Sequence, residues 1–98
     1  MSIITTEWIQ YVYVVMGSTG EYSDHVEWPV RAFLLETKAQ QFVEACTREH
    51  ERISYARSGF WIQRRVEVDH ALDPNYQCDY TGTRYYILSV EMDTDPDA

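Results

Sequence analysis

Residues Trp8–Leu35 have the sequence WIQYVYVVMGSTGEYSDHVEWPVRAFLL, which predicts two β-strands joined by a short connection. We expect the first strand over Trp8–Met16, where aromatic and β-branched residues occupy both faces, as in a central strand. The connection, Gly17–Asp24, holds two glycines among small polar residues and is therefore predicted to be a loop. His25–Leu35 alternates as a second strand, and Pro29 places it at a sheet edge because proline cannot donate to a ladder. The apolar face predicted for this strand holds Val26, Trp28, Val30, Ala32 and Leu34.

A helix is predicted after the hairpin. Thr37 and Gln40 have the spacing of a capping box, which marks the start of a helix. Gly59 is the expected end, since glycine readily adopts the left-handed conformation that follows a helix. We expect the apolar stripe of this helix to lie on the sheet. The stripe consists of Ala39, Phe42, Val43, Cys46, His50 and Ile53.

Side chains expected to face inward and outward alternate over Arg84–Met92, which predicts a third strand. Residues 58–78 show no clear pattern, and ALDPNYQC within them is typical of a loop. We expect Tyr86, Leu88, Val90 and Met92 to face inward and Tyr85, Ser89 and Glu91 to face outward. A right-handed crossover would make the second and third strands parallel, with the first strand antiparallel between them. The predicted fold is therefore α+β (β-β-α-β): a small, three-stranded, mostly antiparallel sheet in the order 2-1-3, with one long helix on one face.

The composition indicates a single folded domain, residues 1–98, with an acidic tail at 93–98 that we expect to be disordered. The longest apolar run, Tyr11–Met16, is far shorter than the roughly 20 residues that span a bilayer. The start, MSIITTEW, has no signal-peptide pattern. Two cysteines, Cys46 and Cys78, fit reduced thiols, so we expect a cytoplasmic protein without a membrane association.

The net charge of −8 is unevenly distributed along the chain. Residues 1–30 carry four acidic residues and no basic one, and residues 66–98 carry eight acidic residues against Arg84 alone. Direct nucleic-acid binding is disfavoured, because the chain has no basic surface of the required size. An acidic surface suits a basic protein or a nucleoprotein complex as the partner, although it is also explained by solubility alone.

The loop GSTGEYSD leaves the end of the first strand, and the loop DYTGT enters the start of the last strand, which is antiparallel to the first. The two loops should therefore meet at the same end of the sheet. Their polar residues are the best candidate binding site: Ser18, Thr19, Glu21, Tyr22, Asp24, Asp79, Tyr80 and Thr81. The favoured interpretation is structural, with these side chains bonding one another as turn and cap residues that fix the register of the last strand. The alternative is a site for a small ligand, with or without a minor enzymatic activity.

Four further residues are candidates for a metal site or a nucleophile–base pair: Cys46, His50, His70 and Cys78. Their spacing matches no zinc module, and Cys46 lies within the apolar stripe, so we expect no metal, no cofactor and no catalysis. His50 in that stripe needs a hydrogen-bond partner, either a tyrosine hydroxyl or an acidic group from residues 60–78. The tail residues Asp93, Asp95 and Asp97 begin like a calcium loop but lack its glycine and closing glutamate.

The segments YVV, GSTGEYSD and VEWPV, together with DP and DYTGTRYY, resemble a family of small uncharacterised proteins from bacteriophages and prophages. The resemblance covers most of the chain and is weakest over residues 58–72. It implies a phage or prophage setting and no particular activity. Small accessory phage proteins of this size and acidity often bind and block a host protein, including host defence machinery, and by this analogy we expect the chain to bind and inhibit or modulate a host protein in the host-cell cytoplasm. A DNA mimic is a further alternative, which the basic residues of the middle of the chain fit poorly: Arg48, Arg52, Arg57, Arg64 and Arg65.

One helix can cover only one face of the predicted sheet. The other face would carry either Trp8, Val12 and Val14 or Ile9, Tyr11, Tyr13 and Val15, with Phe33, Tyr85 and Ile87 beside them. Soluble monomers rarely expose such a patch. Either the segment containing Phe60, Trp61 and Ile62 covers it or a second copy does, and we expect a two-fold homodimer.

Overall fold

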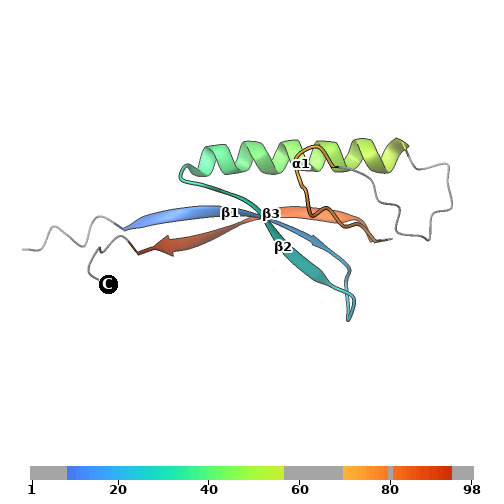
Figure 1. Ribbon diagram of the computed structural model, residues 1–98, viewed down its shortest axis with the longest axis horizontal. Helices are drawn as coiled ribbons and strands as arrows, with labels where there is room; N and C mark the ends of the chain where they lie inside the picture. Colours follow the sequence, from blue (N-terminus) through green and yellow to red (C-terminus); the bar gives the residue numbers. More distant parts are fainter. Residues whose placement is uncertain (1–8, 57–69, 80, 94–98) are drawn as a thin grey trace, which may run out of the picture.

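The computed structural model describes residues 9–56, 70–79 and 81–93. In chain order it contains β1 (Gln10–Thr19), β2 (Val26–Phe33), α1 (Glu36–Ala56) and β3 (Thr83–Met92). The three strands form one sheet in the order β2-β1-β3, with β1 antiparallel to both neighbours. α1 runs along one face of this sheet (Figure 1). The predicted class, element order and strand order are therefore confirmed.

β1 pairs along its whole length with β3, from Gln10 opposite Met92 to Thr19 opposite Thr83. It ends at Thr19 and so extends beyond the predicted end at Met16. Gly17 lies within the strand, and the ring of Trp28 packs directly on it. A Cβ at Gly17 would come within 2.6 Å of that ring, so only glycine fits at this position. This glycine serves close packing rather than the turn.

β2 contains an irregularity that changes which side chains share a face. Val15 is opposite Arg31, whereas Met16 is opposite Pro29, so Val30 is an extra residue. The prediction that Val26, Trp28, Val30, Ala32 and Leu34 share one face is therefore wrong, because an extra residue shifts a two-residue period. Trp28 is buried, whereas Ala32 is exposed and lies opposite Val14, and Leu34 is exposed beyond the end of the strand.

α1 covers the sheet with the predicted stripe, in which Ala39, Cys46 and Ile53 are buried. Val15 and Tyr85 complete the core from the sheet side, and the partly buried Phe33 and Phe42 pack against it with ring centroids 5.3 Å apart. The helix begins at Glu36, so Thr37 lies inside its first turn and the predicted capping box is wrong. The carbonyl of Leu35 already accepts from the amide of Ala39 at 3.1 Å. Gly59, the predicted end, lies outside the described residues.

The faces of β3 are the reverse of those predicted. Tyr85 is buried under the helix at 9% exposure, whereas Tyr86, Leu88 and Val90 are 36%, 48% and 44% exposed on the opposite side. Phe33 and Ile87, expected away from the helix, also pack against the core. Both faces of β3 carry large apolar side chains, so alternation alone does not show which one the helix covers. The covered face is the one where the Tyr85 hydroxyl finds a buried hydrogen-bond acceptor, Asp73.

In the described ranges, no helix combines the length and the apolar character needed to cross a lipid bilayer.

Candidate functional site

The two polar loops meet at the end of the sheet where β1 ends and β3 begins, and they are joined by hydrogen bonds. Thr19 Oγ1 donates to Asp79 Oδ1 at 3.1 Å and lies 2.7 Å from the carbonyl of Gly82. The amide of Asp79 donates back to Thr19 Oγ1 at 3.0 Å. Thr81 donates to Asp79 Oδ1 through both its amide, at 2.7 Å, and its hydroxyl. These are the contacts that the structural interpretation of the loops predicts.

The electrostatics of Asp79 follow from these contacts. The side-chain hydrogen bond from Thr81 lowers the pKa of Asp79, while desolvation opposes the shift. The Thr81 amide and the side chains of Thr19 and Asp24 lower this pKa further. The second carboxylate oxygen, Oδ2, is buried and has no hydrogen-bond partner among the described residues. Asp79 is thus an ionised acceptor that fixes the conformation of its own turn.

Two glycines allow the loops to approach each other. Gly20 and Gly82 have φ values of +91° and +87°, a conformation that side chains rarely adopt. The Gly20 amide donates to Thr81 Oγ1 at 3.2 Å, and its carbonyl accepts from Arg84 Nη2 at 3.0 Å. His25 Nδ1 also lies 2.9 Å from this carbonyl. Most polar groups at the junction are therefore engaged within the protein.

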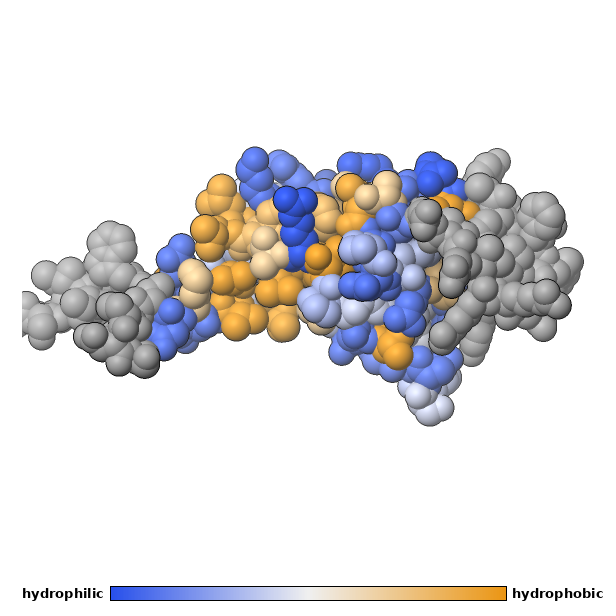
Figure 2. All heavy atoms as spheres, viewed as in Figure 1, coloured by the Kyte–Doolittle hydropathy of each residue, from blue (hydrophilic) through white to orange (hydrophobic). Residues whose placement is uncertain are grey.

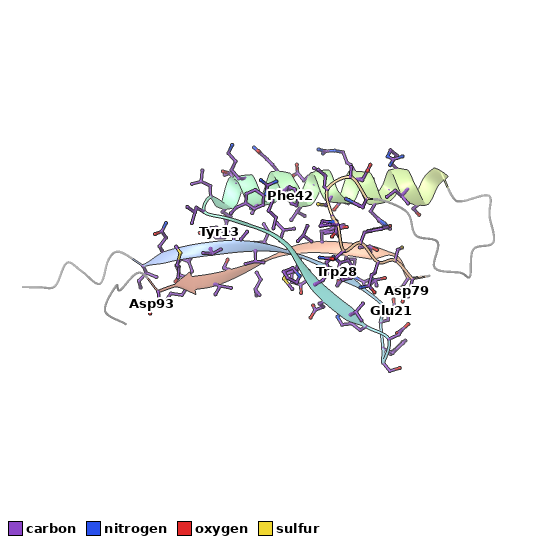
Figure 3. The ribbon with its side chains drawn as sticks, in the orientation of Figure 1. Tyr13, Glu21, Trp28, Phe42, Asp79 and Asp93 are labelled. Carbon is purple, nitrogen blue, oxygen red and sulfur yellow. The ribbon has the colours of Figure 1, made fainter. Side chains whose placement is uncertain are left out.

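The eight candidate site residues divide into two groups. Ser18 and Thr19 are buried and, with Asp79 and Thr81, belong to the loop junction. Glu21, Tyr22 and Asp24 are exposed at the tip of the β1–β2 hairpin, where Tyr22 is 78% exposed. Figure 3 shows Glu21 and Asp79 at the same end of the sheet. Tyr80 lies outside the described residues, and the binding role of the group stays a prediction.

Asp73 organises a second polar cluster, which the sequence reasoning missed. It is 1% exposed, and its Oδ2 accepts from Trp28 Nε1 at 2.9 Å and from the Tyr85 hydroxyl at 2.8 Å. Its Oδ1 accepts from the amide of Asn75 at 3.1 Å, which closes the turn containing Pro74. The Asp-Pro-Asn sequence was a signal for this turn. It gave no indication that the carboxylate would hold an edge strand and the last strand together.

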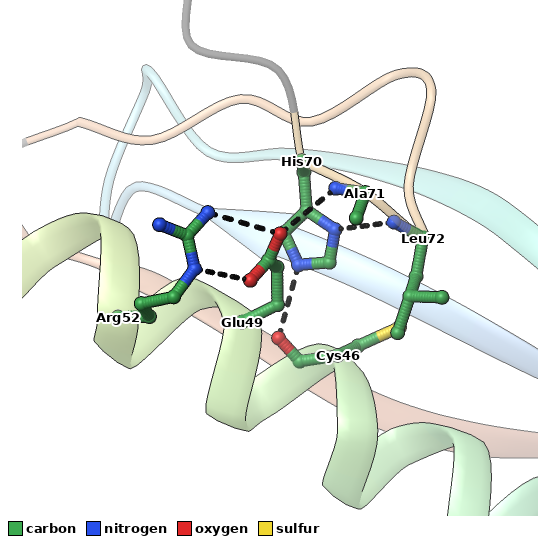
Figure 4. Close-up of polar contacts among 6 residues, drawn as sticks. All are labelled: Cys46, Glu49, Arg52, His70, Ala71 and Leu72. Atoms are coloured by element: carbon green, nitrogen blue, oxygen red, sulfur yellow. Dashed lines mark hydrogen bonds and ion pairs between the residues drawn. The ribbon is translucent and has the colours of Figure 1, made fainter.

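The histidines attach residues 70–79 to the helix. The amide of Leu72 donates to His70 Nδ1 at 3.1 Å, so the proton resides on Nε2, which donates to the Cys46 carbonyl at 3.0 Å (Figure 4). In the same way, the Thr83 amide approaches His50 Nε2 at 3.4 Å, and Nδ1 lies 2.7 Å from the Tyr76 hydroxyl. The prediction that a tyrosine hydroxyl or an acidic group from residues 60–78 would satisfy His50 is confirmed by Tyr76.

An ion pair on the helix surface adds a further attachment. Arg52 donates to Glu49 at 2.6 Å and 3.2 Å, and the amide of Ala71 donates to Glu49 Oε2 at 3.1 Å (Figure 4). These hydrogen bonds, led by those from Arg52, lower the pKa of Glu49 to about 2. Glu49 therefore stays ionised and continues to accept from the residue 70–79 segment at any ordinary pH.

Within the cysteine–histidine set, Cys46 is in a setting that disfavours its thiolate. Cys46 is fully buried, and desolvation raises the pKa of its thiol to about 12, with the charge of Asp73 acting in the same direction. A thiol with a raised pKa is a poor nucleophile and a poor metal ligand, because both roles require the thiolate. Cys78 donates its thiol to the Asp79 carbonyl at 3.4 Å. Within residues 9–56, 70–79 and 81–93, no group of three or more His, Cys, Asp or Glu residues is arranged to hold a metal ion.

The face of the sheet opposite α1 carries exposed apolar side chains, among them Tyr86, Leu88 and Val90. We call it the open face, and it consists of Val12, Val14, Met16, Pro29, Ala32, Tyr86, Leu88 and Val90. Further exposed apolar side chains lie where β1 begins and β2 and β3 end: Ile9, Tyr11, Leu34 and Leu35. Figure 2, in which the sheet is seen from the side, shows apolar residues gathered over the half of the molecule where β1 begins and β3 ends.

Searches against family models, curated proteins and solved structures found no match to this chain.

Proposed function

We propose that this chain is a non-catalytic protein-binding module and that the open face is its binding surface. The observation that carries the proposal is the exposure of Leu88 and Val90, at 48% and 44%, on the β3 side of an apolar sheet face that continues over Val12 and Val14 of β1. β1 and β3 pair along roughly 33 Å, and β2 widens the sheet to three strands, roughly 14 Å, alongside Tyr13–Thr19. An apolar patch of a few hundred Å² on a soluble chain marks a site of interaction.

The polar residues at the margin of the open face suggest the chemistry of the partner. Glu27 lies at the hairpin end of the face, where it accepts a hydrogen bond from the Tyr86 hydroxyl, and this bond lowers the pKa of Glu27. The chain as a whole has a net charge of −8. A protein surface with an apolar centre and basic residues at its rim would complement this arrangement in both shape and charge.

The resemblance to small bacteriophage and prophage proteins supports a host protein as the partner. Binding that blocks or modulates such a protein, including a component of host defence, needs only a complementary surface. The alternative of a small-ligand site has less support, because Thr19, Asp79 and Thr81 use their polar groups on one another. The exposed tip residues Glu21, Tyr22 and Asp24 are accessible to extend a protein-binding surface.

Affinity capture from a bacterial lysate with three versions of the full chain tests the proposal. The versions are the wild type, Ala32→Lys and Gln41→Lys. Ala32 is exposed on the open face, and Gln41 is exposed on the helix, so each substitution adds the same charge to a different surface. We expect a protein captured by the wild type and by Gln41→Lys to be lost with Ala32→Lys. A partner that Ala32→Lys retains at full yield would show that the open face is not the binding surface.

A further inference from the structure

Among the described residues, no strand pairs with the outer edge of β3, and this edge differs in sequence from the outer edge of β2. Since β3 pairs in the described ranges with no strand other than β1, its outer side beyond Thr83, whose amide approaches His50 Nε2, is open to backbone pairing over Arg84–Met92. β2, on the opposite side of the sheet, contains Pro29 and an extra residue at Val30. Proline and bulges are the features by which sheets prevent pairing with another strand, and β3 has neither of them, nor a lysine.

We propose that two copies of this chain pair along β3, in antiparallel orientation around a two-fold axis at Leu88, to form a continuous six-stranded sheet. The proposal rests on the edge of β3 and not on the open face, so it is independent of the proposed function. In an antiparallel pair with a residue on the axis, open-face residues pair only with open-face residues.

The side chains of β3 are complementary to themselves in this register. Leu88 lies opposite its own copy, and Tyr86 lies opposite Val90 on each side of the axis. The three exposed apolar residues of β3 thus pair with one another, in aromatic–β-branched and aliphatic contacts that stabilise sheets. On the helix side, Ile87 lies opposite Ser89.

The charges permit this pairing despite the acidic character of the chain. β3 contains one basic residue, Arg84, and one acidic residue, Glu91, so the strand itself is neutral. Around an axis at Leu88, Arg84 lies opposite Met92 and Glu91 lies opposite Tyr85. No two like charges face each other across the pair. Such a contact would be destabilising.

The size of the contact predicts a weak, reversible dimer. Residues 84–92 overlap in this register, and nine residues of strand are roughly 30 Å long. With side chains on both faces, such an edge buries on the order of 300–400 Å² per copy, below the roughly 800 Å² of a standard interface. Main-chain hydrogen bonds supply much of the affinity in this mode of recognition. We therefore expect dissociation constants in the micromolar range.

Sedimentation velocity of the full chain between about 5 and 200 μM tests the proposal. We expect the wild type to shift from the 11.6 kDa chain mass to twice that mass as concentration rises. Leu88→Lys and Leu88→Glu should each remain monomeric, because they place like charges on the two-fold axis. Since Leu88 is 48% exposed, both variants should keep the wild-type circular dichroism spectrum.

The decisive sample is an equimolar mixture of the two variants. The introduced lysine of one chain then faces the introduced glutamate of the other across the axis, so the mixture should form the dimer that neither variant forms alone. Ala32→Lys is the matched control: it adds a charge to the same face, two strands away from the edge of β3, and should dimerise like the wild type. The proposal is overturned by a monomeric wild type at 200 μM, by a dimer of Leu88→Lys alone, by a mixture that stays monomeric, or by loss of the dimer in Ala32→Lys.

Discussion

At the scale of single residues, Asp79 and Asp73 perform the same task in different surroundings. Each carboxylate accepts an amide from its own turn and a side-chain donor from a distant strand: Thr19 in the first case, Trp28 in the second. An ionised acceptor with several donors is a strong local constraint, because hydrogen bonds to charged groups are among the strongest. The polar residues of GSTGEYSD and DYTGT are therefore explained in large part by the way the loops are joined.

Asp79→Ala should lower the free energy of unfolding by about 1–2 kcal/mol, the range for losing a cap-type hydrogen bond. The reason is that Thr19 and the amide of Thr81 lose their common acceptor. Urea denaturation followed by tryptophan fluorescence measures the change. Glu21→Ala, which removes an exposed acidic residue from the facing loop, is the control and should leave the urea midpoint unchanged. An unchanged midpoint in Asp79→Ala would contradict the structural role and favour a binding role for this residue.

At the scale of elements, the strands and the helix were predictable because each has a strong local pattern. Two-residue alternation, helical spacing and the glycine-rich loop identified the order β-β-α-β, and Pro29 identified the edge strand. The covered face of β3 and the bulge at Val30 were not predictable, since both depend on what packs against the strand. The same holds for Asp73, whose bond to Trp28 joins residues 45 positions apart.

The segment 70–79 is an element without regular structure, and the contact of its Tyr76 with His50 should be sensitive to pH. Burial lowers the pKa of His50 from its ordinary value of 6.5, and the charge of His70 adds to this effect, while Glu51 opposes it. The unfolded chain therefore takes up a proton near pH 6.5, at a higher pH than the folded protein does. The contribution of His50 to the free energy of unfolding is therefore fully present above pH 6.5 and declines as the pH falls below this value.

Urea midpoints at pH 7.5 and 5.5 for the wild type and His50→Gln measure this contribution. The introduced glutamine does not titrate, and its carbonyl oxygen can take the place of Nε2 as acceptor for the Thr83 amide. We expect the wild type to lose more stability than the variant between the two pH values. An equal loss in both proteins would assign the pH dependence to groups other than His50.

At the scale of the whole molecule, the described core contains few hydrophobic residues compared with the number that stay exposed to solvent. Within residues 9–56, 70–79 and 81–93, six hydrophobic residues are buried, against ten large hydrophobic residues that are exposed. A domain near 100 residues already has a low ratio of buried to exposed surface, so uncovered apolar side chains reduce a narrow margin of stability. Pairing at the β3 edge would cover part of this surface, and a partner on the open face would cover more of it.

If folding is coupled to pairing along β3, the melting temperature must depend on protein concentration. Because only the folded chain dimerises, each tenfold rise in concentration above the dissociation constant stabilises the dimer by about 1.4 kcal/mol, or about 0.7 kcal/mol per chain. For a domain of this size that corresponds to roughly 3–5 °C. Differential scanning calorimetry of the wild type from 20 to 500 μM should show this rise, whereas Leu88→Lys should melt at one temperature throughout. A rise of equal size in both proteins would mean that association does not use the edge of β3, and a constant melting temperature in the wild type would mean that the edge adds nothing to the stability of the fold.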